Sequence, residues 1–118
     1  MLNKKYCFIV DLKDDVNLIA MYENYHRPGV IWPEIVEGIK QCGILEMDIY
    51  RVGDRLVMIL ETIPDFDLKR DFAKMTTLPR QKEWATIMHK FQKKIPFAKP
   101  DEHWVLMTRI FNLNNQIL

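Results

Sequence analysis

Tyr22 and His26 are the residues of this chain whose types and spacing are best suited to chemistry. They stand four positions apart in Tyr22-Glu-Asn-Tyr-His26, and residues at i and i+4 share one face of a helix. Pro28 and Gly29 follow and interrupt the helix, so both polar tips are expected at a helix end that water and a ligand can reach. An imidazole titrates near neutral pH and is the usual side chain for moving a proton in water. The pair therefore predicts an acid–base site.

The elements that must position this pair are predicted by the hydrophobic pattern. The apolar run at residues 5–11 predicts a short, largely buried strand. Asp14 and Asp15 are suited to cap the helix behind it. The apolar stripe of that helix consists of Leu18, Met21, Tyr22, Tyr25 and His26. A second segment is expected to begin at Pro33, a residue favoured in a first turn, and to end at Gly43.

The middle of the chain predicts a hairpin and two further helices. Strands are expected over residues 45–52 and 55–63, because Gly53-Asp54 between them is a two-residue hairpin signal with glycine first. Asp65 is predicted to cap a short helix and Thr77 to cap another. The apolar face of the later helix consists of Trp84, Ile87, Met88 and Phe91.

The C-terminal part predicts the last strand and with it the fold class. Pro96 and Pro100 bracket a rigid loop, and residues 103–113 are expected to be extended. The order strand, helix, two-stranded hairpin, helix, strand is that of the α+β, ferredoxin-like βαββαβ sandwich, here predicted as one domain over residues 1–118. Because the last strand has apolar residues on both faces, both faces of the sheet need cover. A homodimer with its two sheets packed face to face, a dimeric α/β barrel, would provide it.

Composition excludes several classes of function. The apolar fraction of 48% and charged fraction of 28% are ordinary globular values, and 17 basic against 16 acidic residues give a net charge of +1. Without a basic patch, nothing indicates nucleic acid. The apolar runs fall short of the roughly 18 residues of a membrane helix, and the N-terminal one is too short for a signal peptide. A cytoplasmic protein without membrane attachment is expected.

Metal and nucleotide sites are not predicted. Cys7 and Cys42 match no zinc or redox spacing and are expected to be free thiols. His89 and His103 show no ligand spacing with His26. The four glycines never cluster into a phosphate-binding loop.

Several motifs together resemble one known family over about residues 5–113. They are Tyr22-x-x-x-His26, the run Ile31-Trp32-Pro33-Glu34-Ile35, a strand with Gly43 followed by Ile49-Tyr50, and a helix containing tryptophan. This combination resembles the L-rhamnose mutarotase family. The resemblance implies a ferredoxin-like fold assembled as a dimeric barrel, and a cofactor-free isomerase that interconverts the α and β anomers of a deoxy sugar.

The resemblance also implies roles for particular residues. It assigns the family's catalytic histidine to His26 and its helical tyrosine to Tyr22. A tryptophan of the later helix falls on Trp84, followed by Ala85 where family members often have a second ring. A further family tyrosine falls on Met47, and two residues are added between the histidine and Ile-Trp-Pro. Because a phenol and a ring are missing, L-fucose competes with L-rhamnose as the expected substrate.

The chemistry of anomer exchange suits these residue types. The ring hemiacetal opens, rotates about C1–C2 and closes again, so O1 loses a proton while the ring oxygen gains one. We expect His26 to transfer one proton and Tyr22 to orient or relay the other. Trp84, and with it Trp32, would offer an aromatic face to the apolar side of the sugar, and Met47 would line the same substrate-binding pocket.

These residues also fit other functions. Without the resemblance, His26 is expected to be a capping or solvent-facing residue, Tyr22 an ordinary tyrosine at the edge of the core, and Trp84 a core residue. The same fold hosts cofactor-free monooxygenases and haem-handling proteins, in which His26 would be a base or an axial ligand. A non-catalytic sugar-binding or assembly module is the third class. Glu46 and Asp48 are expected on a solvated or interface face, and Arg51 shares the strand parity of Met47.

Overall fold

Strand β1 (Lys4–Leu12) lies inside an antiparallel sheet whose order is β2-β3-β1-β4. The computed structural model describes residues 1–115; the last three residues of the domain predicted over 1–118 lie outside it. Strands β2 (Ile44–Val52) and β3 (Arg55–Thr62) form the hairpin, and β4 (Gln92–Lys93) and β5 (Val105–Leu106) both pair with β1. This is the strand order of the ferredoxin-like α+β fold, as predicted.

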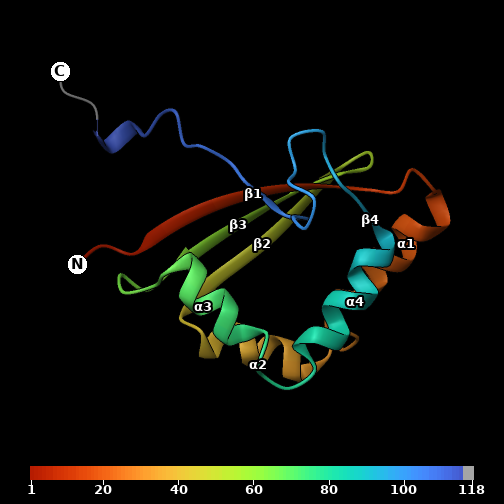
Figure 1. Cartoon of the computed structure of the whole chain (residues 1–118), viewed down its shortest axis with the longest axis horizontal. Helices are drawn as coiled ribbons and strands as arrows, with labels where there is room; N and C mark the ends of the chain where they lie inside the picture. The colour runs from red at the N-terminus through yellow and green to blue at the C-terminus, as the bar shows by residue number, and fades with distance from the viewer. Residues whose placement is uncertain (116–118) are drawn as a thin grey trace.

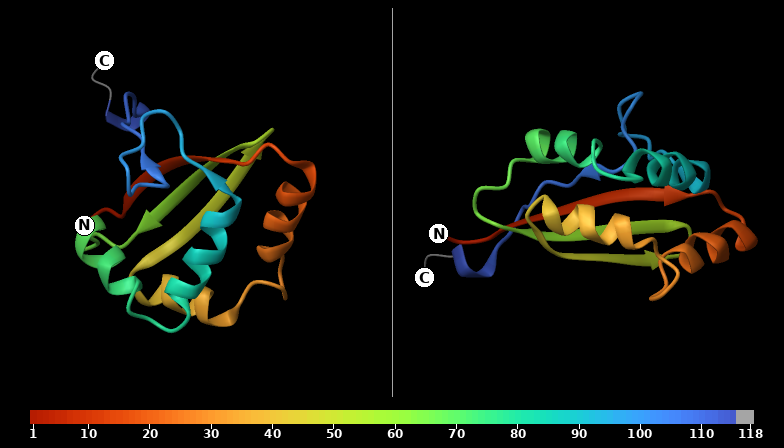
Figure 2. Two further views of the ribbon diagram at one scale, coloured as in Figure 1. Left: turned by 45° about the vertical axis from the view of Figure 1, so that its right-hand side comes forward. Right: turned by 90° about the horizontal axis from the view of Figure 1, so that it is seen from below.

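Helices gather on one side of this sheet (Figure 1). They are α1 (Val16–Tyr25), α2 (Pro33–Gln41), α3 (Leu68–Met75) and α4 (Gln81–Phe91), and a short 3-10 turn, η1, spans Leu113–Asn115. Figure 2 shows the sheet and this helical layer from two further directions. The sheet therefore has one covered face and one face without helices.

Alternation along the strands builds the core between these layers. On β1, Phe8, Val10 and Leu12 are buried, and the register places Met58 opposite Phe8 and Leu56 opposite Val10. One buried cluster includes Val10, Leu12, Tyr22, Leu56, Met88 and Phe91, and the other Phe8, Ile44, Met58, Leu60 and Phe66. Tyr22 thus belongs to the core.

The helix that carries Tyr22 and His26 begins and ends as predicted. Asp15 is its N-cap, and the Oδ1 atom accepts from the backbone N–H of Asn17 at 2.9 Å and Leu18 at 3.0 Å. His26 is its C-cap, and Gly29 follows with φ of 81°. The break turns the chain toward α2, which begins at Pro33.

Glycines shape both ends of β2. Gly43 follows the C-cap of α2 with φ of 91°, a left-handed conformation that L side chains rarely adopt. Gly53 opens the β2–β3 turn with φ of 58°. The predicted helix end and the predicted hairpin are both confirmed.

Two predicted helix caps were wrong. The cap of α3 is Asp67, whose Oδ2 atom accepts from the backbone N–H of Arg70, and not Asp65. The N-cap of α4 is Arg80 with φ of 62°, and not Thr77, whose hydroxyl donates to the carbonyl of Lys74 behind it. Both short polar residues lie in turns, where the Thr77 hydroxyl has a backbone partner and the Asp65 carboxylate forms an ion pair with Arg70.

The last strand was also predicted wrongly. Of residues 103–113, only β5 is strand; β4, directly after α4, provides another part of the fourth position. β4 pairs with Asp11 and Leu12, whereas β5 pairs with Phe8 and Ile9. The chain between them, residues 94–104, leaves the sheet and returns. Alternating apolar residues indicate extended chain, but they do not show where it finds a hydrogen-bonding partner.

Candidate active site

Two adjoining cavities, of about 580 and 250 Å³, lie between the sheet and its helical layer. The larger reaches the edge strand β2, and the smaller extends inward to α4. They share five residues, Tyr22, His26, Ile31, Met47 and Ile49. Tyr22 and His26 therefore face both parts of one continuous hollow.

The two rings lie close together at the end of α1. Their centroids are 4.6 Å apart with planes at 36°. The ring nitrogen Nδ1 of His26 is 2.7 Å from the backbone carbonyl oxygen of Tyr22, so Nδ1–H donates to it. A neutral imidazole with its proton on Nδ1 keeps Nε2 as an acceptor. The helix end thus selects the tautomer that can take a proton from a ligand.

Burial sets the charge of both groups. It lowers the pKa of His26 below the ordinary value of 6.5, although the bond to the Tyr22 carbonyl acts in the opposite direction. Burial raises the pKa of Tyr22 above its ordinary value, with the bond from Gln92 opposing it. At neutral pH the site therefore holds a neutral imidazole beside a protonated phenol.

The phenol hydroxyl of Tyr22 accepts a hydrogen bond from the side-chain amide of Gln92. The Nε2 atom of Gln92 is 3.3 Å from the Tyr22 oxygen. An amide N–H can only donate, so the proton of the Tyr22 hydroxyl is left to point elsewhere. Gln92 was not predicted as a site residue, because it falls within a predicted helix pattern and has no motif around it.

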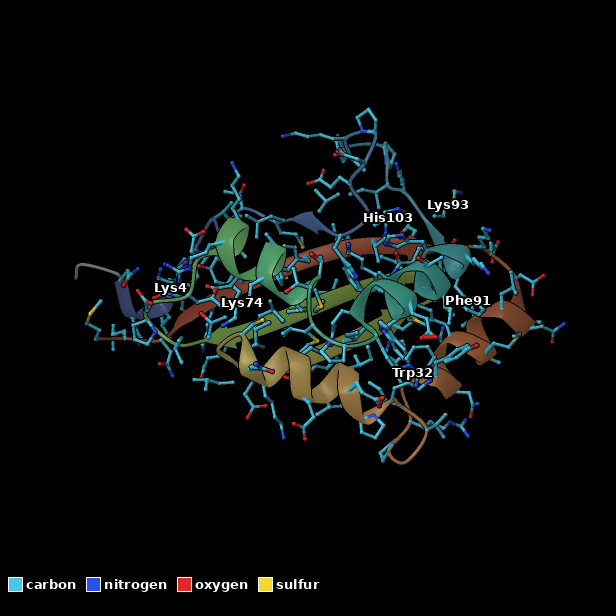
Figure 3. All side chains as sticks on the ribbon, turned by 60° about the horizontal axis from the view of Figure 1, so that its bottom comes forward. Lys4, Trp32, Lys74, Phe91, Lys93 and His103 are labelled. Atoms are coloured by element: carbon cyan, nitrogen blue, oxygen red, sulfur yellow. The ribbon has the colours of Figure 1, made fainter. Side chains whose placement is uncertain are left out.

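Trp84 lines the smaller cavity, and the ring of Trp32 packs against the ring of Trp84. The Trp84 ring lies 5.3 Å from His26 and 5.1 Å from Trp32, edge to face in both cases. The guanidinium carbon of Arg80 lies 3.7 Å above the Trp32 ring. Figure 3 shows Trp32 where the ends of α1, α2 and α4 meet. Within the described part of the chain, Trp32 is not a lining residue of either cavity.

Met47 lines both cavities from the floor. The register places it opposite Leu60 and places Ile49 opposite Met58, on the helix-covered face. The predicted parity of β2 is correct. Glu46 pairs with Glu61 and Asp48 with Ile59, residues of the opposite face.

Arg51 brings charge to the mouth of the larger cavity. It forms an ion pair with Glu23 of α1 and donates to the Gly53 carbonyl at 2.8 Å. Both charged residues line the cavity. Strand parity had related Arg51 to Met47, but the partner Glu23 carried no signal in the sequence, since the contact joins residues far apart in the chain.

Among residues 1–115, no three His, Cys, Asp or Glu side chains gather so that they could hold a metal ion. Each helix in that range is too short or too polar to cross a bilayer.

The chain is a small ferredoxin-like domain with an imidazole and a phenol facing one cavity, which is a candidate acid–base site. Comparison with known proteins identifies its family. The sequence profile described as L-rhamnose mutarotase matches residues 5–113. The chain belongs to the L-rhamnose mutarotase family, which places it among the carbohydrate isomerases.

Individual relatives support this assignment. An L-fucose mutarotase of Xanthomonas campestris pv. campestris is 41% identical over 117 residues, which cover 99% of this chain and 94% of that protein. A UPF0734 protein of Dictyostelium discoideum is 38% identical over 115 residues, covering 94% of this chain and 90% of that one. The crystal structure of an L-rhamnose mutarotase from Formosa agariphila has a TM-score of 0.66, with 93% of this chain and 98% of that chain covered. Its sequence is 18% identical, so it supports the fold alone.

Proposed function

We propose that this protein interconverts the α and β anomers of a 6-deoxy aldose, with His26 as the base. The observation that carries the proposal is the hydrogen bond from Nδ1 of His26 to the Tyr22 carbonyl. It leaves Nε2 as the free acceptor of a neutral ring that faces a cavity of about 580 Å³. That volume is ample for a monosaccharide.

The reaction runs as two coupled proton transfers. Nε2 of His26 takes the proton of the sugar's O1 as the C1–O1 double bond forms and the C1–O5 bond breaks. O5 receives a proton along the hydrogen bond donated by the Tyr22 hydroxyl. The open aldehyde rotates about C1–C2, O5 attacks the other face of C1, and both protons return. No electron transfer or covalent bond to the protein is needed, so the side chains suffice.

The substrate is proposed to be L-fucose or L-rhamnose. The relative that is 41% identical is named an L-fucose mutarotase, whereas the family profile is named for L-rhamnose. Trp84 would stack on the apolar side of the sugar, with Trp32 holding its ring in place, and Met47 would form the floor. The family assignment does not favour a monooxygenase, a haem protein or a non-catalytic module.

A homodimer is part of the proposal. The sheet face away from the helices carries a row of apolar side chains: Ile9, Tyr50, Val57, Ile59 and Met107. Tyr50 is 61% exposed, Met107 43% and Ile59 39% in the single chain. A second copy packed sheet to sheet would cover this face. The smaller cavity is lined from the sheet by Met47, Ile49 and Met58 of the helix-covered face, whereas the larger one also reaches Tyr50 around the edge strand β2.

The test is saturation transfer between the anomeric protons. With L-fucose and L-rhamnose in parallel samples, the protein should speed exchange of at least one sugar beyond its spontaneous rate. Loss of that acceleration in His26→Ala, with an unchanged fold by circular dichroism, would support the assigned base. Acceleration that persists in His26→Ala would refute it.

A further inference from the structure

Gln92 is placed inside the site by the change from helix to strand. It follows Phe91, the last residue of α4, and pairs with Leu12 as the first residue of β4. Its neighbours Phe91 and Lys93 are labelled at this end of α4 in Figure 3. Its side chain is 6% exposed and lines the smaller cavity together with Tyr22, His26 and Trp84. The backbone on both sides fixes where this amide lies.

The amide nitrogen of Gln92 has a hydrogen-bond partner, whereas its amide oxygen has none among the described residues. Nε2 donates to the Tyr22 hydroxyl at 3.3 Å. Oε1 is buried and has no hydrogen-bond partner among the described residues. Buried carbonyl oxygens in folded proteins are nearly always paired, and this one belongs to a residue that lines the cavity. An acceptor in this position suits a ligand that brings a hydroxyl.

Gln81 provides the contrast within the same cavity. It is likewise buried, at 8% exposure, but its Nε2 atom donates to the carbonyls of Glu34, at 3.1 Å, and Ile35, at 3.4 Å, in α2. Its amide joins α4 to α2 and thereby has a structural task. The amide of Gln92 instead contacts the proposed catalytic hydroxyl of Tyr22, and Gln92 lines the cavity.

The chemistry of the sugar identifies which hydroxyl is within reach. Tyr22 serves the reacting atoms O1, C1 and O5, and the amide of Gln92 is adjacent to its hydroxyl. The two ring carbons next to that centre are C5, which carries the methyl group of a 6-deoxy sugar, and C2, which carries a hydroxyl. That hydroxyl is axial in L-rhamnose and equatorial in L-fucose. The contact therefore falls at C2, which is one of the two ring carbons, C2 and C4, whose configuration differs between the candidate substrates.

We propose that Gln92 has two roles. Its N–H donates to the Tyr22 oxygen and so directs the Tyr22 proton toward the sugar, and its Oε1 accepts a hydrogen bond from the 2-hydroxyl of the sugar. Gln92 is thus a positioning and specificity residue. This inference rests on the proposed mutarotase function, because it needs a sugar in the cavity.

The test compares each parent sugar with its 2-deoxy analogue, by anomeric exchange above the spontaneous rate. In the wild-type protein, removing the 2-hydroxyl should lower kcat/KM roughly tenfold, since a site built around that hydroxyl is left with an unpaired acceptor. In Gln92→Leu, both sugars lose the help of the N–H to Tyr22, and the parent sugar also loses the acceptor for its 2-hydroxyl. Both rates should therefore fall, the parent's further, so that the 2-deoxy penalty vanishes. The ratio of L-rhamnose to L-fucose rates should then move toward one.

Gln92→Glu separates the two roles. A carboxylate still accepts from the 2-hydroxyl. It cannot donate to the Tyr22 oxygen, however, and instead accepts a hydrogen bond from the Tyr22 hydroxyl, which turns that proton away from the sugar. We expect kcat to fall while the 2-deoxy penalty persists. A pure packing role would give Gln92→Leu and Gln92→Glu the same loss for both sugars, which would overturn the proposal.

Gln81→Met is the matched control. It removes a buried amide from the same cavity, so it should lower the thermal midpoint, yet it should keep the 2-deoxy penalty. If Gln92→Leu also keeps that penalty, Gln92 does not read the 2-hydroxyl. Wild-type protein that speeds exchange of neither sugar would refute the mutarotase function itself, and this inference with it.

Discussion

The proposed chemistry depends on one imidazole that the fold keeps neutral. Burial lowers the pKa of His26 below 6.5, and a base works in its unprotonated form. Catalysis should therefore be fully present at neutral pH and should fall only as the pH drops through this lowered pKa. The acid limb of kcat/KM against pH should have its midpoint below 6.5. A midpoint above 7 would show that another group carries the base function.

Substitutions at the pair should have unequal effects. His26→Ala removes the base, and general-base catalysis contributes typically 10² to 10⁴-fold, so we expect a loss of that order in kcat. Tyr22→Phe keeps the ring that packs on Phe91, at a centroid distance of 5.9 Å, and removes only the hydroxyl. The loss in kcat should therefore be smaller in Tyr22→Phe than in His26→Ala. NMR exchange rates at saturating sugar measure both, and a larger loss in Tyr22→Phe would reverse the assigned roles.

Local spacing was enough to predict which of the candidate site residues share a face. Tyr22 and His26 share a helix face by their separation alone, and strand parity related Met47 to Arg51. Gln92 and Glu23 were missed because their contacts, to Tyr22 and Arg51, join residues distant in sequence. No local rule of helix or strand periodicity records such pairings. The contact of the Arg80 guanidinium with the Trp32 ring likewise joins residues distant in sequence.

At the scale of elements, the N-terminus of α1 matters most, because this helix carries the proposed catalytic pair, Tyr22 and His26. Asp15→Ala removes two hydrogen bonds to the backbone and should lower the free energy of unfolding by about 1 kcal/mol. Asp14→Ala removes the same charge one residue earlier, outside the cap, and serves as the control. Chemical denaturation of both variants measures the difference. Equal losses would mean that charge near the helix, and not the cap, provides the stability.

The elements themselves were predicted best where a local signal marks both ends. Asp15, Pro33 and the glycines at 43 and 53 mark caps and turns by backbone chemistry that acts within a few residues. The fourth strand has no such marks. Its two parts, β4 and β5, both pair with β1, but the register shifts by ten residues between them because residues 94–104 leave the sheet and return. Pairing between distant segments depends on the whole fold and so escaped the sequence pattern.

At the scale of the whole molecule, the proposed dimer makes a separate prediction. Sedimentation at micromolar concentration should give twice the 14.1 kDa mass of one chain. Ile59→Asp places a charge in the middle of the open sheet face and should yield a monomer, since an unpaired charge is costly to bury. The wild-type chain sedimenting as a monomer would remove the dimer without affecting the assigned chemistry.

The proposed mutarotase function is tested most directly by saturation transfer between the α and β anomeric protons of L-fucose and L-rhamnose, with wild-type protein and with His26→Ala. Wild-type protein should accelerate exchange of at least one of these sugars, and the variant should leave it near the spontaneous rate. Unchanged exchange of both sugars with folded wild-type protein would contradict the proposed function.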